Sequence, residues 1–253
     1  MQVLGHRGAR LAAPENTIEG FRAALDEGAD GVELDVRQTA DGALVCFHDA
    51  ALGRTTDGRG LLREHTLAEV LALDAAASPG RPGTRRFHGV RVPTLAQALD
   101  ALPPAALVDV EVKARGEGPQ GPKDVGAALA AVLAGRGDTG RVMVSSFSRR
   151  VAAAAAAELP GIRIGLVSPS FVPLGRALRA AEGAGCSALA AHVTAYFGPK
   201  AKLVAKRANE EGILLVAWTV DEPQTARRLA DLGVSVVVSD HPGRLVASLR
   251  GGD

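Results

Sequence analysis

Eight short apolar segments of strand length recur along the chain, and longer stretches rich in alanine and leucine separate them. Such alternation predicts parallel strands joined by crossover helices, and eight strands predict a (β/α)8 TIM barrel. A doubly wound parallel sheet is the alternative, but no Gly-x-Gly-x-x-Gly turn follows the first strand. The expected strands lie near residues 2–6, 31–36, 107–112, 141–146, 162–167, 187–191, 213–219 and 235–239. The expected helices lie near 16–28, 94–102, 123–135, 148–159, 174–183, 199–211 and 222–232.

Two features interrupt this alternation. Residues 32–49 hold two strand-like runs around Asp41-Gly42, a dipeptide typical of a β-hairpin turn. Counting outward from that turn predicts that Asp35 and His48 are cross-strand neighbours. The stretch 50–93, rich in Gly, Pro, Thr and Arg, has one helical piece near 66–73 and is too long for an ordinary loop. We expect it to be a small insertion over one end of a single barrel domain that spans residues 1–253.

Charged residues follow the strand period in two of the predicted strands. Glu33 and Asp35 share one face of their strand, and Asp109, Glu111 and Lys113 share one face of theirs. The alternate positions are apolar and suit the outer, helix-covered side of a barrel. Active sites of such barrels lie at the carboxyl ends of the strands. These charges are therefore expected to meet at that end of the barrel.

Three carboxylates in one place repel one another unless they are protonated or neutralised. Lys113 can neutralise one of them, and a divalent cation can neutralise the others. An all-oxygen ligand set favours Mg²⁺ or Ca²⁺ over zinc. The sequence thus predicts one divalent cation, Mg²⁺ or Ca²⁺, with Glu33, Asp35 and Glu111 as its ligands.

His6 and His48 are predicted to be a general acid and base, since they flank the carboxylates and histidine titrates near neutrality. Asp49 is a candidate to orient the ring of His48, although adjacent strand residues face opposite ways. Arg7 and Lys113 add positive charge, which suits an anionic substrate such as a phosphate. The other histidines, with His192 as the best exception, are expected to be structural or on the surface: His65, His88, His192 and His241.

The bulk composition excludes several partners. A net charge of +1 argues against nucleic acid, whose binding domains are strongly basic. The start of the chain has no basic and apolar leader pattern, no apolar run is long enough to span a membrane, and both cysteines are isolated in apolar stretches. These features predict a cytoplasmic protein without stable membrane association. The one basic stretch with an aromatic neighbour, Phe87, contains Arg81, Arg85, Arg86 and Arg91.

The ordered motifs of the chain resemble those of the glycerophosphodiester phosphodiesterase family, within the phospholipase-C-like barrel superfamily. No single motif is specific, but their order and spacing extend over essentially the whole chain. The matching pieces are HRG at 6–8, PENT at 14–17, ELD at 33–35, FHD at 47–49, EVK at 111–113, SSF at 145–147, GLV at 165–167, AWTVDEP at 217–223 and VSD at 238–240.

This resemblance implies hydrolysis of a small glycerophosphodiester to glycerol 3-phosphate and an alcohol, through a cyclic phosphate and with a bound divalent metal. It implies metal ligation by the three carboxylates, acid–base roles for His6 and His48, and phosphate or glycerol contacts from Arg7 and Lys113. Glu15 and Asn16 would brace the first loop. Trp218 would pack on the glycerol.

Three other functions remain open at this point. A phospholipase D or C would act on intact lipid and release a cyclic phosphate as its final product. An aldolase-like barrel would use Lys113 as a Schiff-base lysine, which Glu111 on the same face disfavours. A barrel that binds metal without catalysis would have no need for both histidines.

Overall fold

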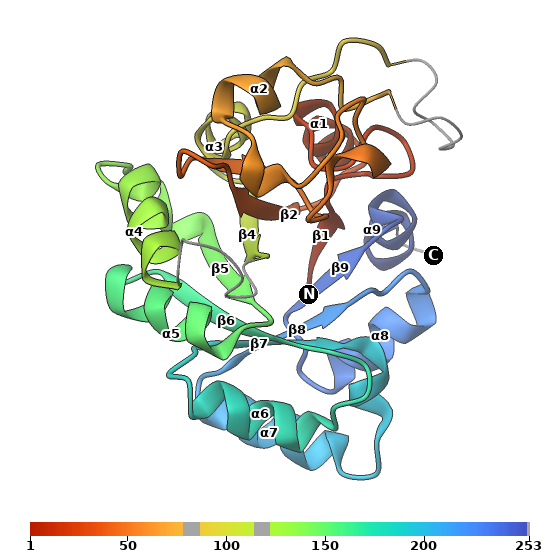
Figure 1. Ribbon diagram of the computed structural model, residues 1–253. Coiled ribbons are helices and arrows are strands. Elements are labelled where there is room, and N and C mark those ends of the chain that lie inside the picture. Colours follow the sequence, from red (N-terminus) through yellow and green to blue (C-terminus); the bar gives the residue numbers. More distant parts are fainter. Residues whose placement is uncertain (78–86, 114–121, 252–253) are drawn as a thin grey trace.

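The computed structural model describes residues 1–77, 87–113 and 122–251, and within them eight parallel strands close into a barrel (Figure 1). The last strand pairs with the first, which closes the sheet. This closure confirms the TIM barrel and rules out the doubly wound sheet. In barrel order the strands are β1 (Gln2–His6), β2 (Gly31–Gln38), β4 (Leu107–Val112), β5 (Val142–Ser146), β6 (Arg163–Ser168), β7 (Ala188–His192), β8 (Leu214–Trp218) and β9 (Val236–Ser239).

Helices surround the barrel on its outer side (Figure 1). They are α1 (Ile18–Asp26), α3 (Leu95–Ala101), α4 (Pro122–Leu133), α5 (Arg149–Glu158), α6 (Leu174–Glu182), α7 (Ala201–Glu210), α8 (Pro223–Asp231) and α9 (Pro242–Arg250). The sequence prediction placed no helix after residues 222–232 and so missed α9. Proline at the first helical position is in fact a start signal, and Leu245 is the fully buried anchor of that helix.

Strand alternation sorts the side chains of the barrel into two layers. Val32, Leu34 and Val36 are fully buried in the large apolar core between strands and helices. Glu33 and Asp35 alternate with them and so point inward. A smaller apolar cluster fills the inside of the barrel with Leu4, Met143, Val167, Ala188, Ala190, Val216, Val236 and Val238.

The predicted hairpin forms, but its register differs from the prediction by one residue. β3 (Leu44–Cys46) runs antiparallel to β2, with Val36 opposite Cys46, so that the backbone of Asp35 pairs with Phe47 and not with His48. The turn has three residues, 40–42. It is closed by the Thr39 amide, which donates to the Ala43 carbonyl, and by the Ala43 amide, which donates to the Thr39 hydroxyl. A two-residue turn cannot be told from this one by the Asp-Gly signal alone.

The segment between β3 and α3 holds η1 (Leu52–Arg54), η2 (Leu62–Glu64) and α2 (Leu67–Ala72) among its described residues. It lies on the side of the barrel formed by β1 and β2, in orange in Figure 1. It packs on β3 through its own apolar cluster of Val45, Phe47, Leu52, Leu62, Val70, Ala75, Val90 and Val92. Residues 78–86 of the predicted insertion, with Arg81, Arg85 and Arg86, lie outside the described residues. Two further short turns are η3 (Thr139–Arg141) and η4 (Val193–Phe197).

Candidate active site

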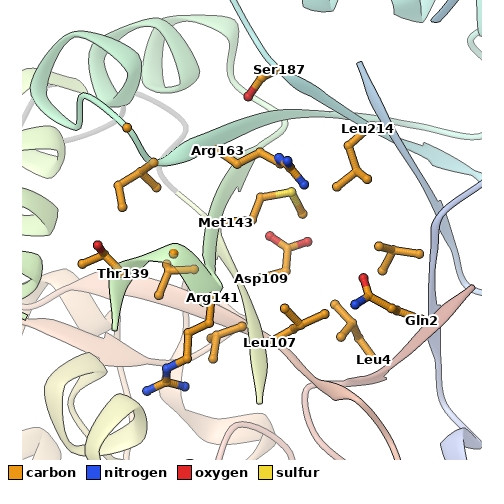
Figure 2. Close-up of a pocket in the computed structure, with 16 residues that line it drawn as sticks. Gln2, Leu4, Leu107, Asp109, Thr139, Arg141, Met143, Arg163, Ser187 and Leu214 are labelled. Carbon is orange, nitrogen blue, oxygen red and sulfur yellow. The ribbon is translucent and has the colours of Figure 1, made fainter. Parts of the chain in front are cut away.

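A cavity lies at each end of the barrel. The one at the amino ends of the strands has a volume of about 380 Å³, and Figure 2 shows Asp109, Met143 and Arg163 pointing into it. Its lining includes none of the predicted catalytic or metal-binding residues among those that the structure describes. The cavity at the carboxyl ends of the strands has a volume of about 750 Å³. Its polar lining includes His6, Arg7, Glu33, Arg37, His48, Glu111 and Lys113. The structure therefore brings the predicted residues together at the expected end of the barrel.

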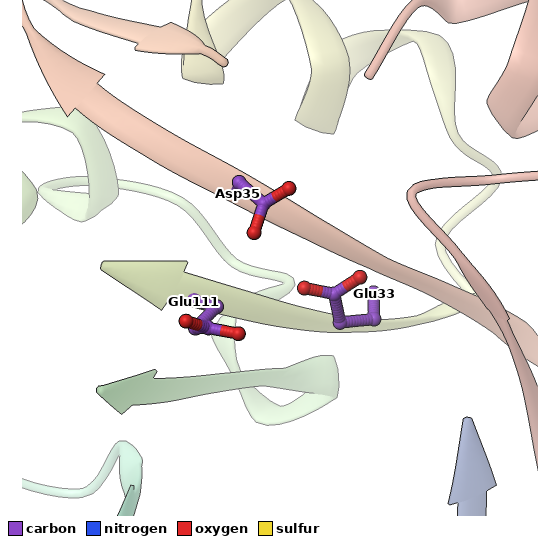
Figure 3. A group of neighbouring side chains, drawn as sticks. All are labelled: Glu33, Asp35 and Glu111. Carbon is purple, nitrogen blue, oxygen red and sulfur yellow. The ribbon is translucent and has the colours of Figure 1, made fainter. Parts of the chain in front are cut away.

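Three carboxylates from two neighbouring strands form a cluster at this cavity (Figure 3): Glu33 and Glu111 line it, and Asp35 is fully buried beside them. Glu33 and Asp35 project from β2 and Glu111 from β4, and one oxygen of each lies within 4.8 Å of the others. Asp35 is paired with Glu111 across the parallel strands, which sets this proximity. Lys113 Nζ lies 3.0 Å from Asp35 Oδ1 and 2.5 Å from Glu111 Oε1.

Burial and mutual repulsion shift the pKa values in this cluster. Burial, with repulsion from Asp35, raises the pKa of Glu33 well above its usual range. Burial raises the pKa of Glu111 to about 7 despite the nearby Lys113. For Asp35 burial opposes ionisation, but Lys113 and Arg7 outweigh it and hold the pKa below its usual value. Lys113 is buried too, yet Asp35 and Glu111 raise its pKa, so it stays an ammonium and disfavours the Schiff-base alternative.

The donor set has the chemistry that a hard divalent cation requires. Glu33 Oε1, Asp35 Oδ1 and Glu111 Oε1 are buried and accept no hydrogen bond from the described residues. Lys113 offsets two of these oxygens only as an ion pair, and Glu33 Oε1 has no cation beside it among the described residues. Oxygen ligands of this kind are those that Mg²⁺ and Ca²⁺ prefer. The three residues therefore fit a divalent cation.

The loop after β1 is built to hold Arg7 at this cluster. Arg7 has a left-handed backbone, with φ of 56°, which is uncommon outside glycine. Its amide donates to Glu33 Oε2 at 2.9 Å, while its guanidinium lies 3.1 Å from Asp35 Oδ2 and 3.1 Å from Glu15 Oε1. Gly8 permits this turn because a Cβ there would lie 2.4 Å from the Gly20 backbone. Arg7 therefore contacts Glu33 through its backbone, and Asp35 and Glu15 through its side chain.

Asn16 plays a different part from the one its position in the sequence suggests. Asn16, with Glu19 three residues later, has the spacing of a capping box and would cap α1 by that pattern, but the cap is Thr17, whose hydroxyl accepts from the Gly20 amide. Asn16 instead donates through Nδ2 to Asp35 Oδ2 at 2.8 Å and accepts from the Asp35 amide at 3.0 Å. Asn16 therefore braces Asp35 of β2.

His6 has a carboxylate partner, Asp240, to which the sequence motifs assigned no role. Its Nδ1 lies 2.6 Å from Asp240 Oδ1, while its Nε2 lies 4.0 Å from Glu33 Oε2. Arg10 also contacts Asp240, with Nε 2.9 Å from Oδ1. Asp240 directly follows the last barrel strand, which is paired with β1. Its position at a strand end is the signal that would have identified it.

His48 lies at the end of the hairpin and is held by its own neighbour. Its Nδ1 is 2.6 Å from Asp49 Oδ1, and Arg54 in turn contacts both oxygens of Asp49. Arg37, from β2, donates to the His48 carbonyl at 2.8 Å and to the Lys113 carbonyl at 3.1 Å. Arg37 was not among the predicted residues, although it shares the inward face of Glu33 and Asp35.

The opposite wall of the cavity is apolar. Trp218 ends β8, donates through Nε1 to the Ala190 carbonyl at 3.1 Å, and meets Phe147 edge to face at 5.6 Å between ring centroids. Phe171 also lines the cavity and is 83% exposed. His192 stands beside this wall, with its ring centroid 5.1 Å from that of Trp218, but it is not among the described residues that line the cavity. The cavity thus joins a charged half to an aromatic half.

The remaining histidines lie apart from the site. His65 is bonded through Nε2 to the Arg59 carbonyl at 3.0 Å, and His88 and His241 are exposed. None of the three lines the cavity at the carboxyl ends of the strands. Among the helices that the structure describes, none is long and apolar enough to cross a membrane.

Known proteins match this chain over nearly its full length. Residues 6–244 match the model of the glycerophosphoryl diester phosphodiesterase family. The chain is 33% identical over 253 residues to the glycerophosphodiester phosphodiesterase of Caldanaerobacter subterraneus, covering 99% of this chain and 98% of that protein.

Solved structures agree with this match. A phosphodiesterase of Oleispira antarctica, in complex with its product sn-glycerol 3-phosphate, has a TM-score of 0.82 and 28% identity, covering 98% of this chain and 96% of that one. A glycerophosphodiester phosphodiesterase of Agrobacterium tumefaciens has a TM-score of 0.76 and 27% identity, covering 98% and 99%. Sequence, fold and site geometry therefore lead to one conclusion: the chain belongs to the glycerophosphoryl diester phosphodiesterase family and is a phosphodiesterase.

Proposed function

We propose that the chain hydrolyses water-soluble glycerophosphodiesters to glycerol 3-phosphate and an alcohol, with one divalent cation, Mg²⁺ or Ca²⁺, in its site. The observation that carries this proposal is one cavity that combines an acidic cluster with two carboxylate-paired histidines. The product held by the Oleispira relative supports the substrate class.

Glu33, Asp35 and Glu111 would hold the cation. When bound, it would stabilise negative charge on a phosphate oxygen and lower the pKa of the glycerol 2-hydroxyl. The three residues supply fixed, buried oxygens, and Asn16 keeps Asp35 in place through two hydrogen bonds. Arg7 and Lys113 balance the carboxylates and add positive charge on the side where a phosphate would enter.

His6 and His48 would move the protons. In the first step one histidine accepts the 2-hydroxyl proton, the 2-oxygen bonds to phosphorus, and the bond from phosphorus to the alcohol breaks. The other histidine donates a proton to the departing alcohol. In the second step water attacks the cyclic phosphate, the bond to the 2-oxygen breaks, and the histidines exchange roles.

The carboxylate partners of the two rings suit this chemistry. A carboxylate on Nδ1 holds a neutral histidine in the form with hydrogen on that nitrogen. Nε2 is then left as the proton acceptor, and the same carboxylate stabilises the imidazolium that forms. The aromatic wall, with Trp218, would pack on the carbon skeleton of the glycerol.

The experiment is a direct assay of glycerol 3-phosphate release from a panel of glycerophosphodiesters with different alcohols. We expect release from several of them in the presence of Mg²⁺ or Ca²⁺, and none after chelation. Absence of release from every member of the panel, with either cation present, would refute the proposal.

A further inference from the structure

Arg54 stands outside the catalytic motifs, yet it contacts Glu15 and Asp49, two carboxylates that each contact a charged group of the site. It belongs to η1, in the segment that follows the hairpin. Nη1 and Nη2 donate to the two oxygens of Glu15, at 3.1 and 2.7 Å. Nε and Nη2 donate to the two oxygens of Asp49, the latter at 3.0 Å. One guanidinium thus makes four hydrogen bonds to two carboxylates.

These two carboxylates lead to different functional groups. Glu15 contacts Arg7, which contacts Asp35 in the acidic cluster. Asp49 contacts Nδ1 of His48. Arg54 is therefore the link that joins the loop after β1 to the end of the hairpin. Without a cation between them, Glu15 and Asp49 would repel each other across this junction.

The contact between His48 and Asp49 also needs an external support. Asp49 lies in a bend beyond the end of β3, so no strand pairing fixes the direction of its side chain toward the ring of His48. Two donors from Arg54 fix both oxygens of Asp49 and turn one of them toward Nδ1. Arginine suits this role because its planar fork binds carboxylates through two hydrogen bonds.

We propose that Arg54 is a positioning residue, which holds Asp49 on His48 and Glu15 on Arg7 so that both sides of the site keep their geometry. This inference rests on the proposed acid–base role of His48. It gives the segment after the hairpin a role in positioning groups of the active site, in addition to its packing on β3. Asp35, Arg7, Asp49 and Lys113 are charged groups that act on the ring of His48, and Arg37 donates to its backbone carbonyl.

The test compares Arg54→Met with Arg54→Lys and with a control, Arg59→Met, at an exposed arginine of the same segment. Nitrogen-15 spectra of labelled histidine report which ring nitrogen carries hydrogen, and His48→Gln identifies the His48 signals. We expect hydrogen on Nδ1 of His48 in the wild type and in Arg59→Met. In Arg54→Met we expect a shift toward the form with hydrogen on Nε2.

Activity on glycerophosphodiesters is measured on the same proteins. We expect kcat/KM to fall by about 10–100-fold in Arg54→Met, as for other residues that orient a functional group, and to recover partly in Arg54→Lys. The proposal would be overturned if His48 in Arg54→Met kept its hydrogen on Nδ1, or if the activity of Arg54→Met equalled that of Arg59→Met. If Arg54→Met does not fold, the same two outcomes in Arg54→Lys overturn it. A wild type inactive on every substrate would refute the proposed function alone, since the spectra still test the position of Asp49.

Discussion

The carboxylate of Asp240 lies 2.6 Å from Nδ1 of His6 and joins the last strand of the barrel to the first. Because it holds the ring and would stabilise its protonated form, we predict that Asp240→Asn lowers kcat by at least about 10-fold. Asp231→Asn, at an exposed aspartate ending α8, is the matched control. Steady-state rates on one glycerophosphodiester decide, and equal rates for the two variants would contradict this role.

The histidines themselves are the second prediction. His6→Ala and His48→Ala should each lower kcat by roughly 10²–10⁴-fold, the usual contribution of a general acid or base. Thermal unfolding should show that both variants remain folded. A substrate analogue without the 2-hydroxyl should resist cleavage, since it cannot form the cyclic phosphate. Rapid cleavage of that analogue would instead indicate direct attack by water.

The third prediction concerns the acidic cluster. Chelation should abolish turnover, and Mg²⁺ or Ca²⁺ should restore it. Cation binding should also raise Tm, because it offsets the burial and the mutual repulsion that raise the pKa of Glu33 and Glu111. Glu111→Gln should lose about 100-fold in kcat/KM and most of the Tm increase, whereas Glu64→Gln, at an exposed site, should lose neither. Full activity in excess chelator would exclude a metal-dependent reaction.

The pH dependence forms the fourth prediction. Burial lowers the pKa of His48 below 6.5, while Asp35 and Asp49 act to raise it. A base must be neutral, so activity rises as pH rises through this pKa, and a lowered pKa moves the rise to lower pH. Asp49→Asn removes a raising group and should move the acid limb of kcat/KM further down. Movement of that limb to higher pH would contradict this assignment of the base.

The strand alternation that places Glu33, Asp35 and Glu111 inside the barrel is a local pattern, and so the sequence predicted both the barrel and the acidic cluster. The partner of His6 depends on closure of the sheet between β1 and β9, residues more than 230 positions apart. A local sequence pattern cannot predict a contact between residues so far apart in the chain. The hairpin register differs from the prediction because Thr39 pairs with Ala43 around a loop of three residues, and the Asp-Gly pair alone does not distinguish that loop from one of two residues.

The contacts of Arg54 likewise could not be predicted from local sequence patterns. Arg54 lies in the short helix η1, which has no side-chain periodicity from which its contacts could be predicted. Its partners Asp49 and Glu15 lie 5 and 39 positions away in the sequence. Asn16 fits a capping pattern as well as Thr17 does, and its hydrogen bonds to Asp35 decide between them. In both cases a side chain is fixed by a tertiary contact that outweighs the local preference.

The last prediction concerns access of lipid to the site. Phe171 is 83% exposed and Phe147 42% exposed on the aromatic wall, so the site offers apolar contact to a substrate. Burial of one phenylalanine in a bilayer contributes about 1.5–3 kcal/mol, but stable anchoring takes two signals. We therefore expect no co-sedimentation with vesicles of phosphatidylglycerol and phosphatidylcholine, and no cleavage of their diacyl lipids, while glycerophosphoglycerol is hydrolysed. Vesicle binding that Phe171→Ser removes, together with faster turnover of diacyl lipid, would favour the phospholipase alternative.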